Sequence, residues 1–297
     1  EPEGAERLLP VSHTHKQAHV EIVLTEGGKF ESARAIGKIE IAIPATEASA
    51  GRTGKEPPPH PLCDKVQYCA KDYSVWGGEK PSFFKQYEEQ LSNWCASEHR
   101  HPKAEAVLAY IRSGTLIADL VREKVLYANN EKLLTRWQQE GGVPEIFKVL
   151  QATDGERDQG DAFIRWHVRG LSSSCSAVWE DTTLQDAWAK FDASTKQVKG
   201  LCMVTGQSEI SLAVSHPKRI RNPKDGAKLI SANDGSGFTF RGRFDDKTGA
   251  QACGIGYEIT QKAHNALQWL IKRQSYRNGD QVFVSWAVGG ANIPDPY

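Results

Sequence analysis

Residues 228–273 read KLISANDGSGFTFRGRFDDKTGAQACGIGYEITQKAHNALQWLIKR, and this stretch decides the fold class because it contains two periodicities. In GFTFRGRF, residues 237–244, aromatic and polar side chains alternate, which is typical of a β-strand with one buried face. From Glu258 to Arg273 the apolar residues instead recur at helical spacing, which predicts an amphipathic helix. Its expected apolar stripe is Ile259, Ala263, Ala266, Leu267, Leu270 and Ile271. A strand followed by a helix in one stretch predicts an α+β unit.

The first 80 residues are predicted to be β-rich with one long loop. His19–Leu24 and IEIAI, residues 39–43, have the composition of strands. Residues 45–61 are rich in Gly, Ala, Thr and Pro and end in PPPHP. Proline lacks a backbone donor and fixes φ, so this segment is expected to contain neither a helix nor a central strand.

Residues 81–152 are predicted to form a helical insertion. Between Phe84 and Cys95 the aromatic and apolar residues share one helical face. Pro102 suits the first turn of a second helix, and Gly114 suits its end. LIADLVREKVLY, residues 116–127, and EKLLTRWQQ, residues 131–139, are two further amphipathic pieces that we expect to be helical.

Residues 153–297 are predicted to be mixed, and the whole of residues 1–297 is interpreted as one domain. Thr153–Asp161 is polar and is expected to be a surface loop, and Leu184–Phe191 is expected to be a helix. The strands expected besides residues 237–244 are FIRWHV (163–168), GLCMVTG (200–206), AKLIS (227–231) and QVFVSWAV (281–288).

The composition is that of a globular chain without a membrane segment. Of the 297 residues 39% are hydrophobic, and no apolar run of about 18 residues is found. The N-terminus, EPEGAERLLP, has no secretory signal and no initiator Met, so we expect further residues upstream. The six cysteines form no C-x-x-C pair and several lie in apolar runs, which favours reduced thiols in a cytoplasmic protein over disulfides.

Common catalytic signatures are absent from the sequence. It contains no G-x-x-x-x-G-K-[ST], H-E-x-x-H or G-x-S-x-G motif, and the Gly254–Gly256 pair is too short for a dinucleotide fingerprint. SSSCS, residues 172–176, has no evident base beside it and is interpreted as a turn. The sequence therefore predicts a protein that is not an enzyme and has no cofactor.

Histidines gather in two places without the partners that a metal site needs. His13, His15 and His19 lie close together, and the first two would share one strand face. His99 and His101 follow Cys95, while His167 stands alone in a strand. Because carboxylates or thiolates are missing at ligand spacing, we interpret these residues as solvated or capping histidines and expect no metal.

Basic residues cluster in the last third although the chain as a whole is neutral, with Lys plus Arg equal to Asp plus Glu at 37 each. The segment 216–228 contains Lys218, Arg219, Arg221, Lys224 and Lys228 against Asp225. In the predicted strand 237–244, Arg241 and Arg243 project from the same face. Paired guanidinium groups suit phosphate oxygens, so we predict phosphate contacts, with an exposed solvated strand as the alternative.

The turn SANDGSG, residues 231–237, precedes this strand. Its glycines permit close backbone approach, and Asn233 has both a donor and an acceptor with which to read base edges. A β-hairpin loop accounts for the same residues without any ligand.

Several of these stretches resemble, in the same order, the large subunit of the type I-C CRISPR Cascade complex, an eighth-type Cas protein. The stretches are HPLCDKVQYCAKDY (60–73), GLCMVTGQ (200–207), LISANDGSGFTFRGRF (229–244), YEITQKAHNALQWLIKRQ (257–274) and GDQVFVSWAV (279–288). The resemblance extends from Leu9 to Tyr297. It implies a subunit at one end of a complex of guide RNA and other Cascade subunits.

Such a subunit is expected to recognise the short motif beside the target in double-stranded DNA, to help open the duplex and to recruit a separate helicase-nuclease. Base pairing with the guide reads the rest of the target. The family continues into a C-terminal helical region, and a short N-terminal helix precedes its first strand; neither is found here, so the chain resembles the N-terminal portion.

Two segments compete as the motif reader, namely the loop 231–237 with Asn233 and the segment that contains Lys65 and Gln67. Lys262 is a further candidate for DNA contact. An RNA-binding module is the alternative function, in which Phe238 and Phe240 would be exposed to stack on bases. A metal-dependent nuclease is the third.

Overall fold

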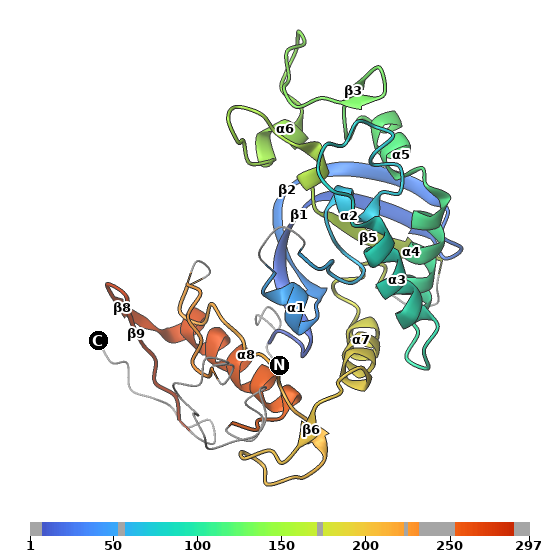
Figure 1. Cartoon of the computed structure of the whole chain (residues 1–297). Coiled ribbons are helices and arrows are strands. Elements are labelled where there is room, and N and C mark those ends of the chain that lie inside the picture. Colours follow the sequence, from blue (N-terminus) through green and yellow to red (C-terminus); the bar gives the residue numbers. More distant parts are fainter. Residues whose placement is uncertain (1–7, 53–56, 171–174, 223–224, 232–252, 288–297) are drawn as a thin grey trace. The chain divides into compact units, whose positions relative to one another are not determined.

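The computed structural model of the chain (Figure 1) describes residues 8–52, 57–170, 175–222, 225–231 and 253–287. Contacts divide the chain into two compact units, one of residues 12–194 and the other of residues 1–11 and 195–297. We call them the sheet unit and the α8 unit. Both contain helices and strands, which confirms the predicted α+β class. The expected strand at residues 237–244 lies outside the described residues.

A three-stranded sheet in the order β2-β1-β5 organises the sheet unit. Strands β1, His13–Thr25, and β2, Phe30–Pro44, pair antiparallel. Strand β5, Ile164–Arg169, pairs in parallel with the other edge of β1. The strands expected at residues 19–24, 39–43 and 163–168 are thereby confirmed, and His13 and His15 both lie in β1.

The sheet has one apolar and one polar face. Val20, Ile22 and Leu24 alternate along β1 and are fully buried, and Val20 and Ile22 lie opposite Ile164 and Trp166. The intervening residue Glu21 lies opposite both Arg34 of β2 and Arg165 of β5. Because side chains alternate between the faces of a sheet, this register gathers several charged residues on the second face.

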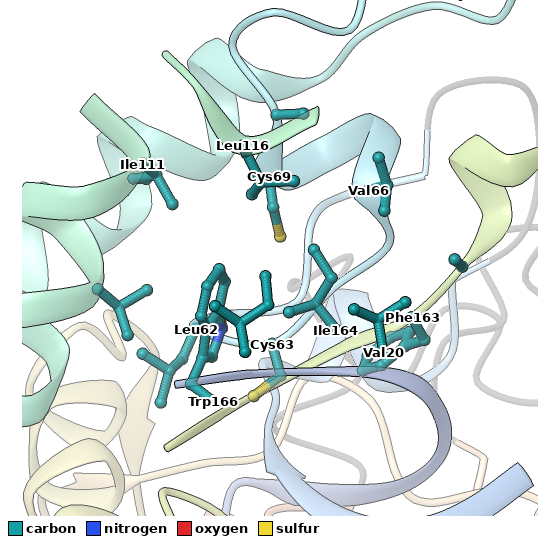
Figure 2. Packing of buried hydrophobic residues seen from close by; sticks show 14 of the residues in the cluster. Val20, Leu62, Cys63, Val66, Cys69, Ile111, Leu116, Phe163, Ile164 and Trp166 are labelled. Atoms are coloured by element: carbon teal, nitrogen blue, oxygen red, sulfur yellow. The ribbon is translucent and has the colours of Figure 1, made fainter. Parts of the chain in front are cut away.

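Helices cover the apolar face and complete the core (Figure 2). The helices here are α2, Val66–Cys69; α3, Phe84–Cys95; α4, Pro102–Ser113; and α5, Leu116–Arg122. Val66 and Cys69, Ile111 and Leu116 point toward the side chains of β1 and β5. The indole of Trp166 is fully buried, and its Nε1–H donates to the Leu62 carbonyl at 2.8 Å.

The sequence signals at helices α3 and α4 are confirmed. On α3 the buried residues include Tyr87, Leu91 and Trp94. Helix α4 begins at Pro102 and is followed by Gly114 at φ 74°, a left-handed conformation that glycine adopts without strain.

Two predictions for the sheet unit are wrong. The loop 45–61 contains one helical turn, α1 (Glu47–Ala50), because Thr46 and Ser49 cap each other's backbone N–H groups. Residues 131–139 are not helical. They enter a hairpin of β3, Ala128–Asn129, and β4, Lys132–Leu133, and the helix expected at 116–127 ends at Arg122.

The cause of the second error is a buried side chain from further along the chain. Gln159, 1% exposed, accepts from the Tyr127 N–H at 2.8 Å and donates to the carbonyls of Tyr127 and Leu134 at 2.7 Å. It lies in the short 3-10 helix Gln159–Asp161, so the expected surface loop 153–161 is buried at its end. A further helix, α6 (Glu145–Val149), was not expected.

Helix α7, Thr182–Ser194, confirms the helix expected at residues 184–191. Asp181 precedes it and accepts from the backbone of Thr183 at 2.9 Å. The ammonium of Lys103, with no exposed side-chain area, donates to Asp181 Oδ2 and to the Cys175 carbonyl. This buried ion pair joins α4 to the start of α7.

Helix α8, Tyr257–Gln274, dominates the α8 unit and confirms the predicted helix. Its most buried side chains include the polar Thr260, His264 and Asn265, whereas Ala263 of the expected apolar stripe is exposed. Hydrogen bonds explain this burial: His216 Nδ1 lies 2.9 Å from Thr260 Oγ1, and Asn265 donates to the Leu9 carbonyl at 2.9 Å.

The strands of the α8 unit are shorter than expected. Strand β6, Lys199–Gly200, pairs with β7, Ile210–Ser211, and β8, Tyr276–Asn278, pairs with β9, Gln281–Phe283. The strand predicted at 200–206 is wrong, because the backbone of Cys202 closes a turn through Gly206 and Gln207. Residues 227–231 contribute an isolated bridge at Lys228, and the strand predicted at 281–288 ends at Phe283.

All six cysteines are free thiols, and Cys63, Cys69 and Cys202 are buried. Within the described ranges, no helix is both long enough and apolar enough to cross a membrane.

Candidate nucleic-acid interface

The predicted contact residues are distributed over both units. Asn233, Arg241 and Arg243 lie outside the described residues, as do Phe238 and Phe240, whose exposure would separate the DNA-binding function from the RNA-binding one. Lys218, Arg219, Arg221 and Lys262 belong to the α8 unit, and Lys65 and Gln67 to the sheet unit.

The basic segment at residues 216–228, which we call the basic run, folds back on itself and is bonded to α8. Lys218 and Lys228 form an antiparallel bridge, so their backbones lie side by side. Ile220 is buried at 6% exposure, and Gln268 of α8 donates to the Arg219 carbonyl at 3.3 Å. Lys218, Arg219 and Lys228 therefore lie close together in the α8 unit.

Arg221 has a structural partner within this segment. Its Nε and Nη2 donate to Asp225 Oδ2 at 2.8 and 2.6 Å, and Nη1 donates to the Asp280 carbonyl at 3.2 Å. The backbone N–H of Ala227 and the Arg221 guanidinium both lower the pKa of Asp225. A phosphate at Arg221 would therefore compete with a carboxylate that remains ionised.

Lys262 lies apart from the run. It is two residues from Thr260, and therefore about 200° around the helix from the face that contacts His216. Its ammonium lies 2.5 Å from Glu258 one turn earlier, and both side chains are 64% exposed. An exposed pair of this kind is worth little and leaves Lys262 available to solvent and ligands alike.

Lys65 belongs to a second basic cluster, together with Lys80. The two ammonium groups lie 2.7 and 2.6 Å from opposite oxygens of Asp161, and Lys80 is also 3.1 Å from Asp158. Burial alone would raise the pKa of Asp161, but the hydrogen bonds from both lysines lower it overall. Lys80, which sequence reasoning missed, has no motif around it that would have revealed it.

Gln67 does not lie on the surface, as a residue that reads DNA bases would. Its side chain is buried at 5% exposure, and its amide donates to the Pro81 carbonyl at 3.4 Å. Among the described residues its Oε1 has no hydrogen-bond partner. Contact with a base would require this side chain to leave the interior.

The charged face of the sheet contains a third group of polar residues, which surrounds Glu21. Arg34 donates to Glu21 Oε1 at 2.7 Å, and Arg165 donates to Oε2 at 2.9 and 2.5 Å. His167 Nε2 lies 3.3 Å from the same Oε2, and its Nδ1 lies 2.9 Å from Ser176 Oγ. The expectation that no base lies near Ser172–Ser176 is therefore wrong for Ser176.

His167 has a lowered pKa and is fixed in orientation. Burial lowers its pKa, and the nearby Glu21 carboxylate only partly opposes that effect. For Glu21, burial would raise the pKa, but the bonds from Arg34 and Arg165 lower it overall. The ring of Trp179 lies edge-on to His167 at 4.8 Å and against the Arg165 guanidinium at 4.1 Å. These contacts immobilise the cluster.

Metal ligation has no support from the described residues, among which no three His, Cys, Asp or Glu side chains form a group able to hold an ion.

A protein-family model matches almost the whole chain. The family model described as "CRISPR-associated protein (Cas_Csd1)" covers residues 1–296, and thus all but the last residue of the chain. No curated protein matches the sequence.

Proposed function

We propose that this chain, which belongs to the CRISPR-associated Cas_Csd1 family, is the DNA-binding large subunit of a type I-C surveillance complex. In this proposal it recognises the motif beside the target, helps to open the duplex and helps to recruit the helicase-nuclease, without cutting DNA itself. The match over residues 1–296 carries the proposal.

Two features of the α8 unit support DNA contact. The basic run is joined to α8 by the bond from Gln268 to the Arg219 carbonyl, and Ile220 beside it is buried, so Lys218 and Arg219 lie on a held stretch of backbone. Phosphate contacts by fixed cations give affinity without sequence preference and position a neighbouring loop for base reading. The loop 231–237, with Asn233, begins three residues after Lys228 in the chain.

Salt dependence of DNA binding tests the phosphate contacts. In the assembled complex, Lys218→Gln or Arg219→Gln should weaken binding to all duplexes alike and lower the salt slope by about one unit, as should Arg241→Gln or Arg243→Gln. Lys148→Gln is a matched control, since Lys148 is a surface lysine of α6 paired with Glu145 at 3.5 Å. A salt slope that stays unchanged in all four variants would exclude these residues as phosphate contacts.

Motif reading is tested on duplexes with and without the motif. Asn233→Ala should weaken binding of the motif-bearing duplex by about 1–3 kcal/mol and leave the other duplex unaffected. Lys65→Ala is the competing variant. A selective loss with Lys65→Ala alone would move the reader to the sheet unit, and equal losses on both duplexes would remove Asn233 from consideration.

A further inference from the structure

The polar face of the sheet is hollowed beside the Glu21 cluster. A pocket of about 400 Å³ opens there, and its polar lining consists of Glu21, Ser32, Arg34, His167, Arg169 and Ser176. The register explains why these residues meet. Arg34 lies opposite Glu21, Ser32 and His167 both lie opposite Val23, and Arg169 lies opposite Thr25.

The pocket is therefore a trough with a cation at each end. Glu21 and Thr25 are four residues apart on β1, which separates the attachment points of Arg34 and Arg169 by about 13 Å along the strand. Val23 forms the floor between them and is buried at 8% exposure. Both arginines are long enough to reach inward, and their side chains are 69% and 65% exposed.

Among the groups that ion pairs join here, cations outnumber carboxylates. Three guanidinium groups, those of Arg34, Arg165 and Arg169, face the buried carboxylate of Glu21 and the peripheral Glu31, which lies 3.8 Å from Arg169. Glu21 contacts Nε and Nη2 of Arg34, so the remaining N–H groups of the Arg34 guanidinium can donate into the pocket. Glu21 thereby orients Arg34 without neutralising the trough.

The hydroxyl and imidazole groups add directed donors between the arginines. While His167 is neutral and donates from Nε2 to Glu21, its Nδ1 accepts from Ser176 Oγ. When His167 takes up a proton, Nδ1–H donates to Ser176 Oγ instead, and the Ser176 hydroxyl is released to donate into the pocket. An anion in the trough would favour that second state.

We propose that this trough in the sheet unit is a phosphate-binding site, in which Arg34 and Arg169 contact the phosphate oxygens of a nucleotide unit and Ser32 and Ser176 donate hydrogen bonds between them. Guanidinium forks match phosphate oxygens in geometry and charge. The phosphate can come from a free nucleotide or from the backbone of a single-stranded nucleic acid. The site consists of residues of the sheet unit, whereas the basic run belongs to the α8 unit.

The ring resonances of His167 in NMR spectra report on the trough directly. They are assigned with His167→Gln, and the full chain is then titrated with AMP and, separately, with an unlabelled ten-nucleotide single strand. Both ligands should shift the His167 signals and raise its pKa, since an anion stabilises imidazolium. A response to both identifies a site open to free nucleotides, and a response to the strand alone identifies a backbone site.

Arg34→Gln and Arg169→Gln should each weaken the titration about ten- to a hundredfold, the loss expected for one charge-assisted contact. Arg100→Gln and Arg136→Gln are the controls. Both arginines are exposed cations of the same unit, and they pair with carboxylates outside the trough, Glu105 and Glu156. The proposal is overturned if neither ligand moves the His167 signals, or if the response survives unchanged in Arg34→Gln/Arg169→Gln.

Discussion

Replacing Asp181 by Asn should destabilise the sheet unit strongly. The Lys103 side chain has no exposed area and that of Asp181 is 6% exposed, so their charges neutralise each other away from water. Asn still accepts from the Thr183 N–H, since amides cap helices as well as carboxylates do. The variant thus removes the counter-charge of Lys103 and little else.

The size of the loss follows from the burial of the ammonium. Breaking a buried ion pair by removing one partner costs about 3–5 kcal/mol, because the remaining charge is left without a counter-charge away from water. Since the Lys103 side chain has no exposed area, we expect the loss to lie in this range.

Urea denaturation of the wild type and Asp181→Asn at pH 7 measures the effect. Lys103→Met/Asp181→Asn is the control, because it buries no charge and should recover much of the loss. A loss below about 1 kcal/mol in Asp181→Asn would refute the reasoning.

Three further predictions concern the same unit. Acidification from pH 7 to pH 5 should lower the free energy of unfolding, because burial lowers the pKa of His60 well below 6.5 and the unfolded chain takes up a proton that the folded chain does not. His60→Gln should flatten this part of a curve of unfolding free energy against pH. An equal slope in the variant would contradict the assignment to His60. Trp166→Ala should cost about 3–5 kcal/mol in urea denaturation and Trp166→Phe clearly less, since the buried indole would leave a large cavity; similar costs for both would show that the lost bond to Leu62 dominates instead. Gln159→Leu should cost about 3 kcal/mol and accelerate amide hydrogen exchange at Tyr127, because that N–H loses its side-chain partner; unchanged protection would mean that another acceptor replaces it.

Local signals were sufficient to predict the main helices and the sheet strands. Pro102 and Gly114 delimit α4 by backbone preferences that act within a few residues. The apolar spacing of α3 and α8 indicated helices in the same local way. For β1, β2 and β5 the β-rich composition was enough to find the strands, but it contained no information about which strands pair.

The errors arose where distant residues decide the local structure. EKLLTRWQQ has helical spacing, yet Gln159 binds the backbone of Tyr127 and Leu134 and fixes a hairpin there. On α8 most of the expected apolar stripe is less buried than Thr260 and Asn265, because His216 and Leu9 supply hydrogen-bond partners for these two polar side chains. Propensity is a weak prior against such tertiary contacts.

The candidate phosphate site could not be predicted from spacing. Glu21 and His167 are brought together by the parallel pairing of β1 with β5, in which Glu21 lies opposite Arg165 and Val23 opposite His167. Ser176 joins them because the Val168 N–H donates to the Ser176 carbonyl at 2.9 Å. The sequence around His167 and the serine-rich stretch 172–176 therefore did not indicate that His167 and Ser176 lie in contact.

The Glu21 cluster is a costly way to stabilise a sheet. A buried ion pair gains little over apolar residues of the same volume, because both charges lose their hydration. Here one carboxylate, 5% exposed, receives two guanidinium groups and lies near an imidazole. What the arrangement does provide is orientation: Arg165 is packed between Glu21 and Trp179, and Arg34 is held with part of its donor fork turned toward solvent. Fixed donors bind an anion without the entropy that a free arginine would lose on binding. The buried carboxylate thus makes physical sense as a support for a binding surface, and not as a source of stability.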